Sequence, residues 1–302
     1  MKRQPQIGWL EDGRRLHLQD GPIDLIVEAH GSETNLCAAY RAAARRFTGL
    51  LDELCAELTS LRQAADPEHC ALQGTVARRM HAAVAPFAAE HFITPMAAVA
   101  GSVAEEILGA MTQEASLDRA YVNNGGDIAL HLADGEQFTL GLMDRPDQFG
   151  LMRTVNIHAG DPSRGVATSG RHGRSFSLGI ADAVTVLSRT AALADAAATI
   201  IANAVDLPGH PAITRCPAQE LQPDSDLGAR LVTRDVGRLE EFEIAAALET
   251  GAGKAGVLFA SSLIEGASLH LQGEMRVIGL KRLNAKLPRP ACGRGIESAI
   301  HA

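Results

Sequence analysis

The stretch that decides the fold is residues 121–128, YVNNGGDI. Its Asn-Asn-Gly-Gly segment stands between two apolar runs, which is typical of antiparallel strands joined by a tight turn, because glycine readily adopts the positive φ angles that such turns require. Further runs with strand character surround it, at residues 119–122, 128–132, 137–142 and 152–158. The sequence therefore predicts a largely antiparallel sheet around this turn.

Helices are predicted on both sides of these strands. Apolar residues recur at steps of three and four from Leu36 to Leu61, which predicts one long helix that begins after Gly31-Ser32 and packs its stripe on a core. A hairpin is predicted before it, over residues 15–27 with a turn at Asp20-Gly21-Pro22. Further helices are expected at residues 75–87, 96–111, 187–205 and 239–248, a looser segment at 206–227, and further strands at 256–260, 268–272 and 275–280.

This order of elements predicts an α+β fold with mainly antiparallel sheets packed with helices, because the chain lacks the strand–helix alternation of a βαβ protein. No internal repeat or low-complexity linker divides the sequence. We therefore expect a single domain over residues 1–286. Residues 287–302, which include Pro288 and Pro290, are expected to be an unstructured tail.

Composition excludes several classes of protein. The 302 residues carry 28 basic and 36 acidic side chains, a net charge of −8, which argues against a nucleic-acid binder. No apolar run of about 18 residues is present, so no membrane span is expected. The five cysteines are odd in number and form no CxxC pair, and the N-terminus has no apolar signal-peptide core. Reduced thiols and a cytoplasmic location are therefore expected.

Two segments are candidates for binding a cofactor. Residues 95–102, PMAAVAGS, put small side chains at a helix start, where free N–H groups favour an anion such as a diphosphate; close helix packing explains the same residues. The 121–128 turn is either a plain hairpin or a bare-backbone contact with a cofactor. The candidate binding residues are Ala98, Ala100, Gly101, Ser102, Asn123, Gly125, Gly126 and Asp127.

A third segment, VATSG at residues 166–170, precedes Asp195 and Thr199. These two lie four positions apart in a predicted helix and share a face. Carboxylate and hydroxyl oxygens suit Mg²⁺, which also takes phosphate oxygens and waters; alternatively, Thr199 bonds its own helix backbone and Asp195 faces solvent. His172, just after the segment, is either a general base or phosphate contact, or a solvated loop residue.

Taken together, these segments resemble the FAD:protein FMN transferase (ApbE-like) superfamily. Its transferases carry a DLGAIAKG-like helix start, a GGDI turn, a VATSG segment and an ADALAT helix, in the order seen here at residues 97–102, 125–128, 166–170 and 194–199. The match spans residues 94–204, about a third of the chain. The resemblance implies an ApbE-like, T-fold-like α+β fold.

The resemblance also implies a ligand. FAD would bind with its diphosphate near the small-residue helix and the GGD turn, and Mg²⁺ would be held by Asp195, Thr199 and the carbonyl of Ala100. Such a metal polarises the diphosphate and stabilises charge on the leaving AMP, while FMN passes to a Thr or Ser of a flavoprotein acceptor. The VATSG residues Thr168, Ser169 and Gly170 join the binding set.

Two departures from the transferase pattern matter. Gly101 stands where transferases have the lysine of AIAKG, and residues 175–186, SFSLGIADAVTV, replace a His-Ile-Ile-Asp-Pro motif. Asp182 stands near the aspartate of that motif, so His172 and Asp182 are the catalytic candidates. The chain therefore resembles a sister branch of the superfamily more than a true transferase.

These observations leave four hypotheses for function. The leading one is an enzyme that binds FAD with Mg²⁺ and acts at the diphosphate, by FMN transfer or FAD cleavage. The others are a hydrolase or lyase of a small anionic or cyclic metabolite, a non-catalytic flavin carrier, and an interaction scaffold that uses the 36–61 stripe. A homodimer is expected for a cytosolic enzyme of this size.

Overall fold

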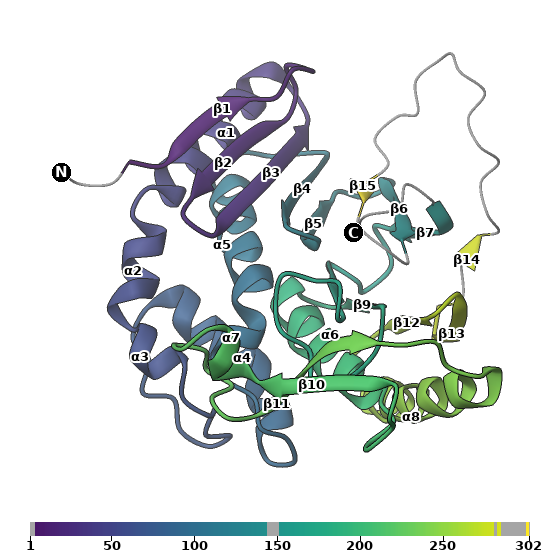
Figure 1. Ribbon diagram of the computed structural model, residues 1–302. Coiled ribbons are helices and arrows are strands. Elements are labelled where there is room, and N and C mark those ends of the chain that lie inside the picture. The colour runs from purple at the N-terminus through teal and green to yellow at the C-terminus, as the bar shows by residue number, and fades with distance from the viewer. Residues whose placement is uncertain (1–3, 144–150, 281–282, 285–299, 302) are drawn as a thin grey trace. The chain divides into compact units, whose positions relative to one another are not determined.

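A computed structural model describes residues 4–143, 151–280, 283–284 and 300–301 (Figure 1). The chain forms two compact units, each built from separated segments. Unit 1 contains residues 1–137, 158–166 and 189–196, and unit 2 contains residues 138–157, 167–188 and 197–302. Both units combine helices with mainly antiparallel strands, which confirms the predicted α+β class. A single domain over residues 1–286 stays a prediction.

Unit 1 is built on a sheet of consecutive antiparallel neighbours. The hairpin predicted over residues 15–27 is confirmed, and so is the turn of Gly125 and Gly126, whose φ angles are +66° and +110°. The edge strand β1 was not predicted. The strands run in the order β1 (Gln6–Trp9), β2 (Leu16–Asp20), β3 (Ile23–His30), β4 (Arg119–Asn124) and β5 (Asp127–Leu132), and β5 pairs with the start of β8 (Gly165–Ser169).

The helices of unit 1 follow the predicted order, with one correction. The single helix expected from Leu36 to Leu61 is wrong, because Gly49 has a φ of +86°, which a right-handed helix cannot contain. The predicted start is right, since Ser32 Oγ accepts the N–H of Asn35. The elements are α1 (Glu33–Phe47), α2 (Leu50–Ala56), α3 (Leu58–Leu61), α4 (Thr75–Ala88), the 3₁₀ turn η1 (Pro95–Ala98) and α5 (Val99–Glu114).

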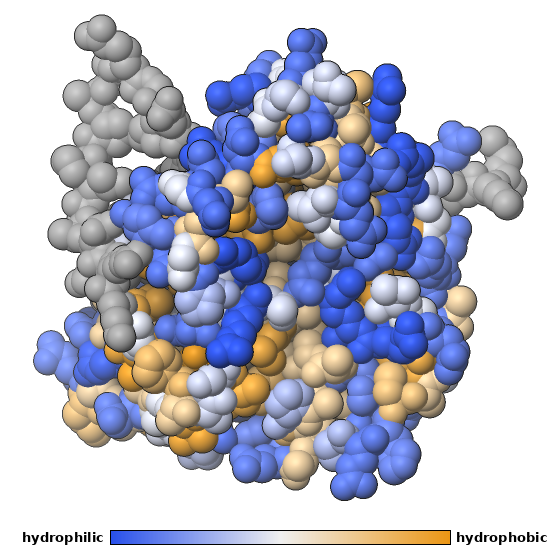
Figure 2. All heavy atoms as spheres, turned by 180° about the vertical axis from the view of Figure 1, so that it is seen from behind, coloured by the Kyte–Doolittle hydropathy of each residue, from blue (hydrophilic) through white to orange (hydrophobic). Residues whose placement is uncertain are grey.

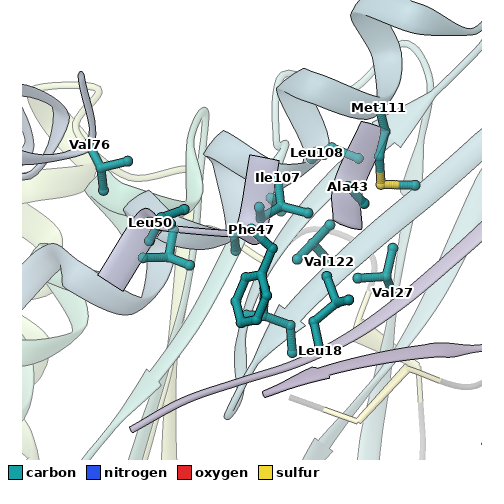
Figure 3. Packing of buried hydrophobic residues seen from close by; sticks show 14 of the residues in the cluster. Leu18, Val27, Ala43, Phe47, Leu50, Val76, Ile107, Leu108, Met111 and Val122 are labelled. Carbon is teal, nitrogen blue, oxygen red and sulfur yellow. The ribbon is translucent and has the colours of Figure 1, made fainter. Parts of the chain in front are cut away.

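The core of unit 1 lies between α1, α5 and one face of the sheet (Figure 3). Phe47 of α1 and Ile107 of α5 are fully buried there, together with Leu18, Val27 and Val122 from three neighbouring strands. The alternation of inward apolar and outward residues in β2 and β3 produces this face, since successive side chains of a strand point to opposite sides. The core thereby fixes α5, whose first turn carries the candidate site.

Unit 2 contains three groups of strands. β9 (Ala183–Ser188) follows β8 in the sheet, then β12 (Gly266–Leu271) and β13 (Glu274–Ile278), on which α8 (Glu241–Ala260) packs. The hairpin β10–β11 is separate. The remaining elements are β6 (Gln137–Met143), β7 (Leu151–His158), β10 (Ile213–Pro217), α7 (Ala218–Leu221), β11 (Leu231–Val236), β14 (Leu283–Asn284) and β15 (Ile300–His301), with α6 (Ala191–Ala204) beginning in unit 1.

Three predicted elements need correction. Residues 256–260, expected as a strand, are the last turns of α8, and the helix expected from residue 187 begins only at Ala191, after β9. The looser segment 206–227 contains β10 and α7. Of the tail 287–302, only residues 300–301 are described, and they pair with β6. Short apolar runs carry little periodicity, which explains the first error.

The surface and the thiols agree with the composition. Figure 2 shows hydrophilic residues over most of the face in view, with hydrophobic residues between them. None of the helices among the described residues is long and apolar enough to cross a membrane. The four described cysteines, Cys37, Cys55, Cys70 and Cys216, are free thiols, and Cys292 lies outside the described residues.

Candidate functional site

The side chain of Asp195, in α6, caps the N-terminus of α5. The N–H of Gly101 donates to Asp195 Oδ2 at 3.0 Å, and the N–H of Ala100 also donates to this carboxylate. The N-cap residue of α5, Ala98, has no side chain that could accept these bonds. A carboxylate from another helix therefore takes the role of the N-cap and meets the positive end of the α5 dipole.

The two helices cap each other. Glu105, in the second turn of α5, accepts the N–H of Ala192 in the first turn of α6 at 2.7 Å. Burial raises the pKa of the Glu105 carboxyl, and the Ala192 N–H acts in the opposite direction. Glu105 and Asp195 thus each satisfy the free N–H groups of the other helix. Sequence reasoning missed Glu105, because its partner lies 87 residues away.

Gly101 makes this arrangement possible. A Cβ atom at this position would lie 2.3 Å from the carbonyl oxygen of Ala191 and 2.7 Å from the nitrogen of Ala192. Both are backbone atoms of α6, which no side-chain rotation can move away. The residue that replaces the transferase lysine therefore has to be glycine for α5 and α6 to approach this closely.

Asp195 stays partly accessible although α6 is mostly buried. Burial of the carboxylate raises its pKa to about 7, while the N–H groups of Gly101 and Ala100 oppose that shift. Thr199, one helical turn later, is also partly accessible. The face predicted from the i, i+4 spacing therefore carries a carboxylate and a hydroxyl on an otherwise buried, alanine-rich helix.

The glycine turn is tied to the start of α5 through a residue that the sequence did not single out. The side-chain amide of Asn124 donates to the carbonyl oxygen of Ala100 at 3.2 Å. Asn123, the predicted contact, points to the other face of β4 and uses its Oδ1 to accept the N–H of Gly126 within the turn. The strand alternation identifies Asn124 as the inward residue, a signal that was present in the sequence.

The other predicted residues of unit 1 differ in accessibility. Ala98 and Ser102 are fully buried, and Ser102 Oγ has no hydrogen-bond partner among the described residues. Gly125 is exposed, and Gly126 and Asp127 are partly exposed. The structure therefore brings Ala100, Gly101 and Asp195 together, while Ala98 and Ser102 contribute packing at the same helix start.

The predicted residues of unit 2 include Thr168, Ser169 and Gly170 at the end of β8. Thr168 Oγ1 lies 2.9 Å from Thr185 Oγ1, and Ser169 is partly exposed at the end of β8. Gly170 has a φ of +146°, and a Cβ there would lie 2.6 Å from the carbonyl oxygen of Asp182. The VATSG segment thus ends on a glycine, because the backbone of Asp182 leaves no room for a side chain at this position.

Asp182 is a fully engaged carboxylate. Its Oδ1 accepts Arg171 Nε at 2.8 Å and lies 3.2 Å from His172 Nε2, and its Oδ2 accepts the N–H of Gln272. The side chain of His172 is 23% exposed, against 7% for Asp182. Asp182 therefore bonds Arg171 and the backbone of Gln272, and His172 is the more accessible of the two predicted catalytic residues.

Mg²⁺ fits the oxygen donors of α6. Among the described residues, no three His, Cys, Asp or Glu side chains are grouped so as to hold a metal. Mg²⁺ does not need such a group, because it is commonly held by one or two carboxylates and completes its shell with phosphate oxygens and waters. Asp195 keeps lone pairs beyond those bound by Gly101 and Ala100, and Thr199 adds a hydroxyl.

Comparison with known proteins identifies the family. A model of the family described as AbpE bacteria matches residues 7–277. The chain belongs to this family. It is thus a member of the ApbE-like superfamily, as the four sequence segments indicated.

The ApbE-like chain has relatives among curated proteins and solved structures. It is 42% identical to the UPF0280 protein of Methanothrix thermoacetophila over 114 residues, which cover 37% of this chain and 46% of that protein. For the UPF0280 protein of Methanopyrus kandleri the values are 40% over 129 residues, covering 42% and 48%. The chain spans about half the length of the curated relatives it matches.

A solved structure of a histidine-to-glycine mutant of flavin transferase ApbE from Vibrio cholerae is also similar. The TM-score is 0.44 at 11% identity, over 88% of this chain and 97% of that chain. Flavin transfer is the activity of that protein.

Proposed function

We propose that this ApbE-like protein binds FAD together with Mg²⁺ and acts at the FAD diphosphate, by FMN transfer or by FAD cleavage. The observation that carries the proposal is Asp195, a partly accessible carboxylate held by two backbone N–H groups and followed one turn later by Thr199. Mg²⁺ bound there would neutralise the diphosphate and stabilise charge on the leaving AMP.

The hydrogen bonds between Asp195 and the start of α5 limit how a diphosphate could bind. The N–H groups of Ala100 and Gly101 already donate to Asp195, so they are not free to bind phosphate directly. The Asp195 carboxylate offsets the positive potential of the helix start, so a diphosphate would meet negative charge there unless a cation binds to Asp195. The proposal therefore requires the metal, and binding of FAD without Mg²⁺ should be weak.

The residues around Asp195 have positioning roles in this proposal. Asn124 holds the carbonyl of Ala100, the third metal contact implied by the resemblance, through its amide. Because Ala100 is the second residue of α5, its carbonyl oxygen also accepts the helical N–H of Ala104, so a metal would have to displace the Asn124 amide to bind this oxygen. Gly101 keeps α5 against α6, so the distance between the Ala100 carbonyl and Asp195 depends on it.

His172 is the proposed proton acceptor. His172 Nε2 is buried 3.2 Å from Asp182 Oδ1 and makes no hydrogen bond within the described part of the chain, so Nδ1 is the ring nitrogen proposed to accept a proton. Asp182 acts here as a positioning residue, held by Arg171 and Gln272. A His172→Gln variant should therefore lose turnover but keep Mg²⁺-dependent FAD binding.

The first test is a fluorescence titration of FAD with and without Mg²⁺, on the wild-type chain and on Asp195→Asn. We expect Mg²⁺ to tighten FAD binding in the wild type, and the variant to lose that effect. The matched control is Glu240→Gln, which removes another helix-capping carboxylate, in the capping box of α8. Equal Mg²⁺-dependent binding by Asp195→Asn and the wild type would refute the metal assignment.

AMP release with and without a flavoprotein acceptor is the second readout and separates the enzymatic roles. FMN transfer moves FMN to an acceptor hydroxyl and releases AMP, whereas FAD cleavage uses water and releases AMP and FMN without an acceptor. Tight binding of FAD without any product would instead support a flavin carrier. A cytoplasmic location and a homodimer remain part of the proposal, and sedimentation of the purified chain tests the second.

A second candidate function is that of a hydrolase or lyase acting on a small anionic or cyclic metabolite. The favouring observation is that Gly101 leaves no room for the transferase lysine, while His172 and Asp182 form a base with its orienting carboxylate. A screen with small cyclic amides tests this function. Turnover that is lost in His172→Gln and kept in Asp195→Asn would favour it over the flavin reaction.

A further inference from the structure

Unit 1 contains a cavity on the side of the sheet where α1 packs. Its volume is about 690 Å³, which is in the range of small-molecule sites. The loop after β1, the end of β3 and the first three turns of α1 enclose it. The residues that matter for its chemistry are Trp9, Arg14, Leu36, Tyr40 and Arg41.

One wall of the cavity is aromatic and fixed in place. The rings of Trp9 and Tyr40 meet edge to face, with centroids 4.8 Å apart and an interplanar angle of 78°. The hydroxyl of Tyr40 accepts the N–H of Ala29 and donates to the carbonyl of Arg14, so the tyrosine ring cannot rotate away. Trp9 is nevertheless 55% exposed, which leaves ring surface for a ligand.

Two arginines of the cavity can bind an anion. Arg14 and Arg41 line it, and neither guanidinium has a carboxylate partner among the residues that the structure describes. By contrast, Arg46 and Arg79 of the same unit each pair with glutamates. Two unpaired arginines beside one apolar cavity match a carboxylate, which a guanidinium binds through two parallel N–H donors.

Two acidic residues also line the cavity, and among the described residues neither forms an ion pair with Arg14 or Arg41. Ala29 faces α1, so the preceding residue, Glu28, points to the other face of β3. There, Glu28 Oε2 accepts a hydrogen bond from the hydroxyl of Tyr121 at 3.0 Å. Glu33 offsets one of the two arginines but stands in the first turn of α1, where the helix dipole is positive. The formal charges of these four side chains sum to zero, and the two guanidinium groups remain available to a carboxylate because neither has a carboxylate partner among the described residues.

We propose that this cavity binds a small aromatic carboxylate, with its ring against Trp9 and Tyr40 and its carboxylate on Arg14 and Arg41. None of the residues that cap α5 or surround Asp182 lines this cavity. The proposal is therefore independent of the flavin site, and an Asp195→Asn variant should bind the carboxylate as the wild type does.

The protein offers its own reporter for the test, because Trp9 is its only tryptophan. The probe is 4-phenylbutyrate, which does not absorb where tryptophan is excited selectively, and the matched probe is 4-phenylbutylamine, with the same ring and the opposite charge. We expect 4-phenylbutyrate to change Trp9 fluorescence with a single saturable isotherm that calorimetry reproduces. The amine should give no such isotherm.

Charge variants decide whether the arginines carry the binding. Arg14→Gln and Arg41→Gln should each weaken 4-phenylbutyrate binding about tenfold, the effect of losing one charge-assisted contact. Arg78→Gln is the matched control, because Arg78 is an exposed arginine of α4 outside the cavity. Equal binding of the two probes, no saturable signal, or an equal loss in Arg78→Gln would overturn the proposal.

Discussion

Replacing Gly101 by alanine tests the contact that holds the candidate site together. The added Cβ would lie 2.3 Å from the carbonyl oxygen of Ala191, whereas an ordinary contact needs about 3.4 Å. The first turns of α5 and α6 therefore have to separate by about 1 Å. That displacement lengthens both reciprocal caps, the one from Gly101 to Asp195 and the one from Ala192 to Glu105.

The magnitude follows from three effects. Overpacking of this kind costs about 1–3 kcal/mol of the free energy of unfolding. Weakening the two caps adds about 0.5–2 kcal/mol for each. Alanine recovers about 1 kcal/mol relative to glycine in a helix. We therefore expect Gly101→Ala to lower the free energy of unfolding by about 1–6 kcal/mol and to abolish Mg²⁺-dependent FAD binding.

The assay is urea unfolding followed by circular dichroism, with Gly109→Ala as the matched control. Gly109 belongs to the same helix, and a Cβ there would meet nothing within 4 Å. Gly109→Ala should therefore raise stability by up to about 1 kcal/mol. Similar midpoints for the two variants would refute the reasoning, because the two substitutions differ only in the contact with α6.

Three further predictions concern charge and backbone strain. Because burial raises the pKa of Asp195 to about 7 from an ordinary 3.8, the folded chain binds more protons than the unfolded chain between these values. Its free energy of unfolding should fall as pH rises from 4 to 7, Mg²⁺ binding should strengthen through pH 7, and Asp195→Asn should flatten both profiles. Arg79→Ala leaves two partly buried glutamates short of a partner and should cost about 1–3 kcal/mol in urea unfolding. Arg45→Ala, which breaks an exposed pair, should cost less than about 1 kcal/mol, and equal losses would contradict this ranking. Gly170→Ala should displace the backbone of Asp182 and reduce turnover more than Mg²⁺-dependent FAD binding, which enzyme assays and titrations distinguish.

Much of the fold could be predicted because its signals are local. The hairpin over residues 15–27, the turn at Gly125-Gly126 and the N-cap at Ser32 each depend on residues within a few positions of one another. Errors occurred where a short apolar or polar run gave no clear period. For that reason the end of α8 was predicted as a strand, and β10 and β11 were not predicted.

The candidate site was predicted in part. The i, i+4 spacing of Asp195 and Thr199 correctly placed both on one partly accessible face of α6. The partners of Asp195 were not predictable, because the Gly101 N–H lies 94 residues away in the chain. Asn124 was passed over for Asn123, although strand alternation distinguishes them.

The sequence by itself determined the α+β class, most element boundaries and the family, because propensity, turn chemistry and motif order are properties of neighbouring residues. Only the tertiary structure decided that Asp195 and Glu105 cap each other's helices, that Gly101 admits no side chain, and that Arg14 and Arg41 line one aromatic cavity. The physical reason is that hydrogen bonds, steric contacts and charge depend on distances in space, and these arise only when separated segments pack together.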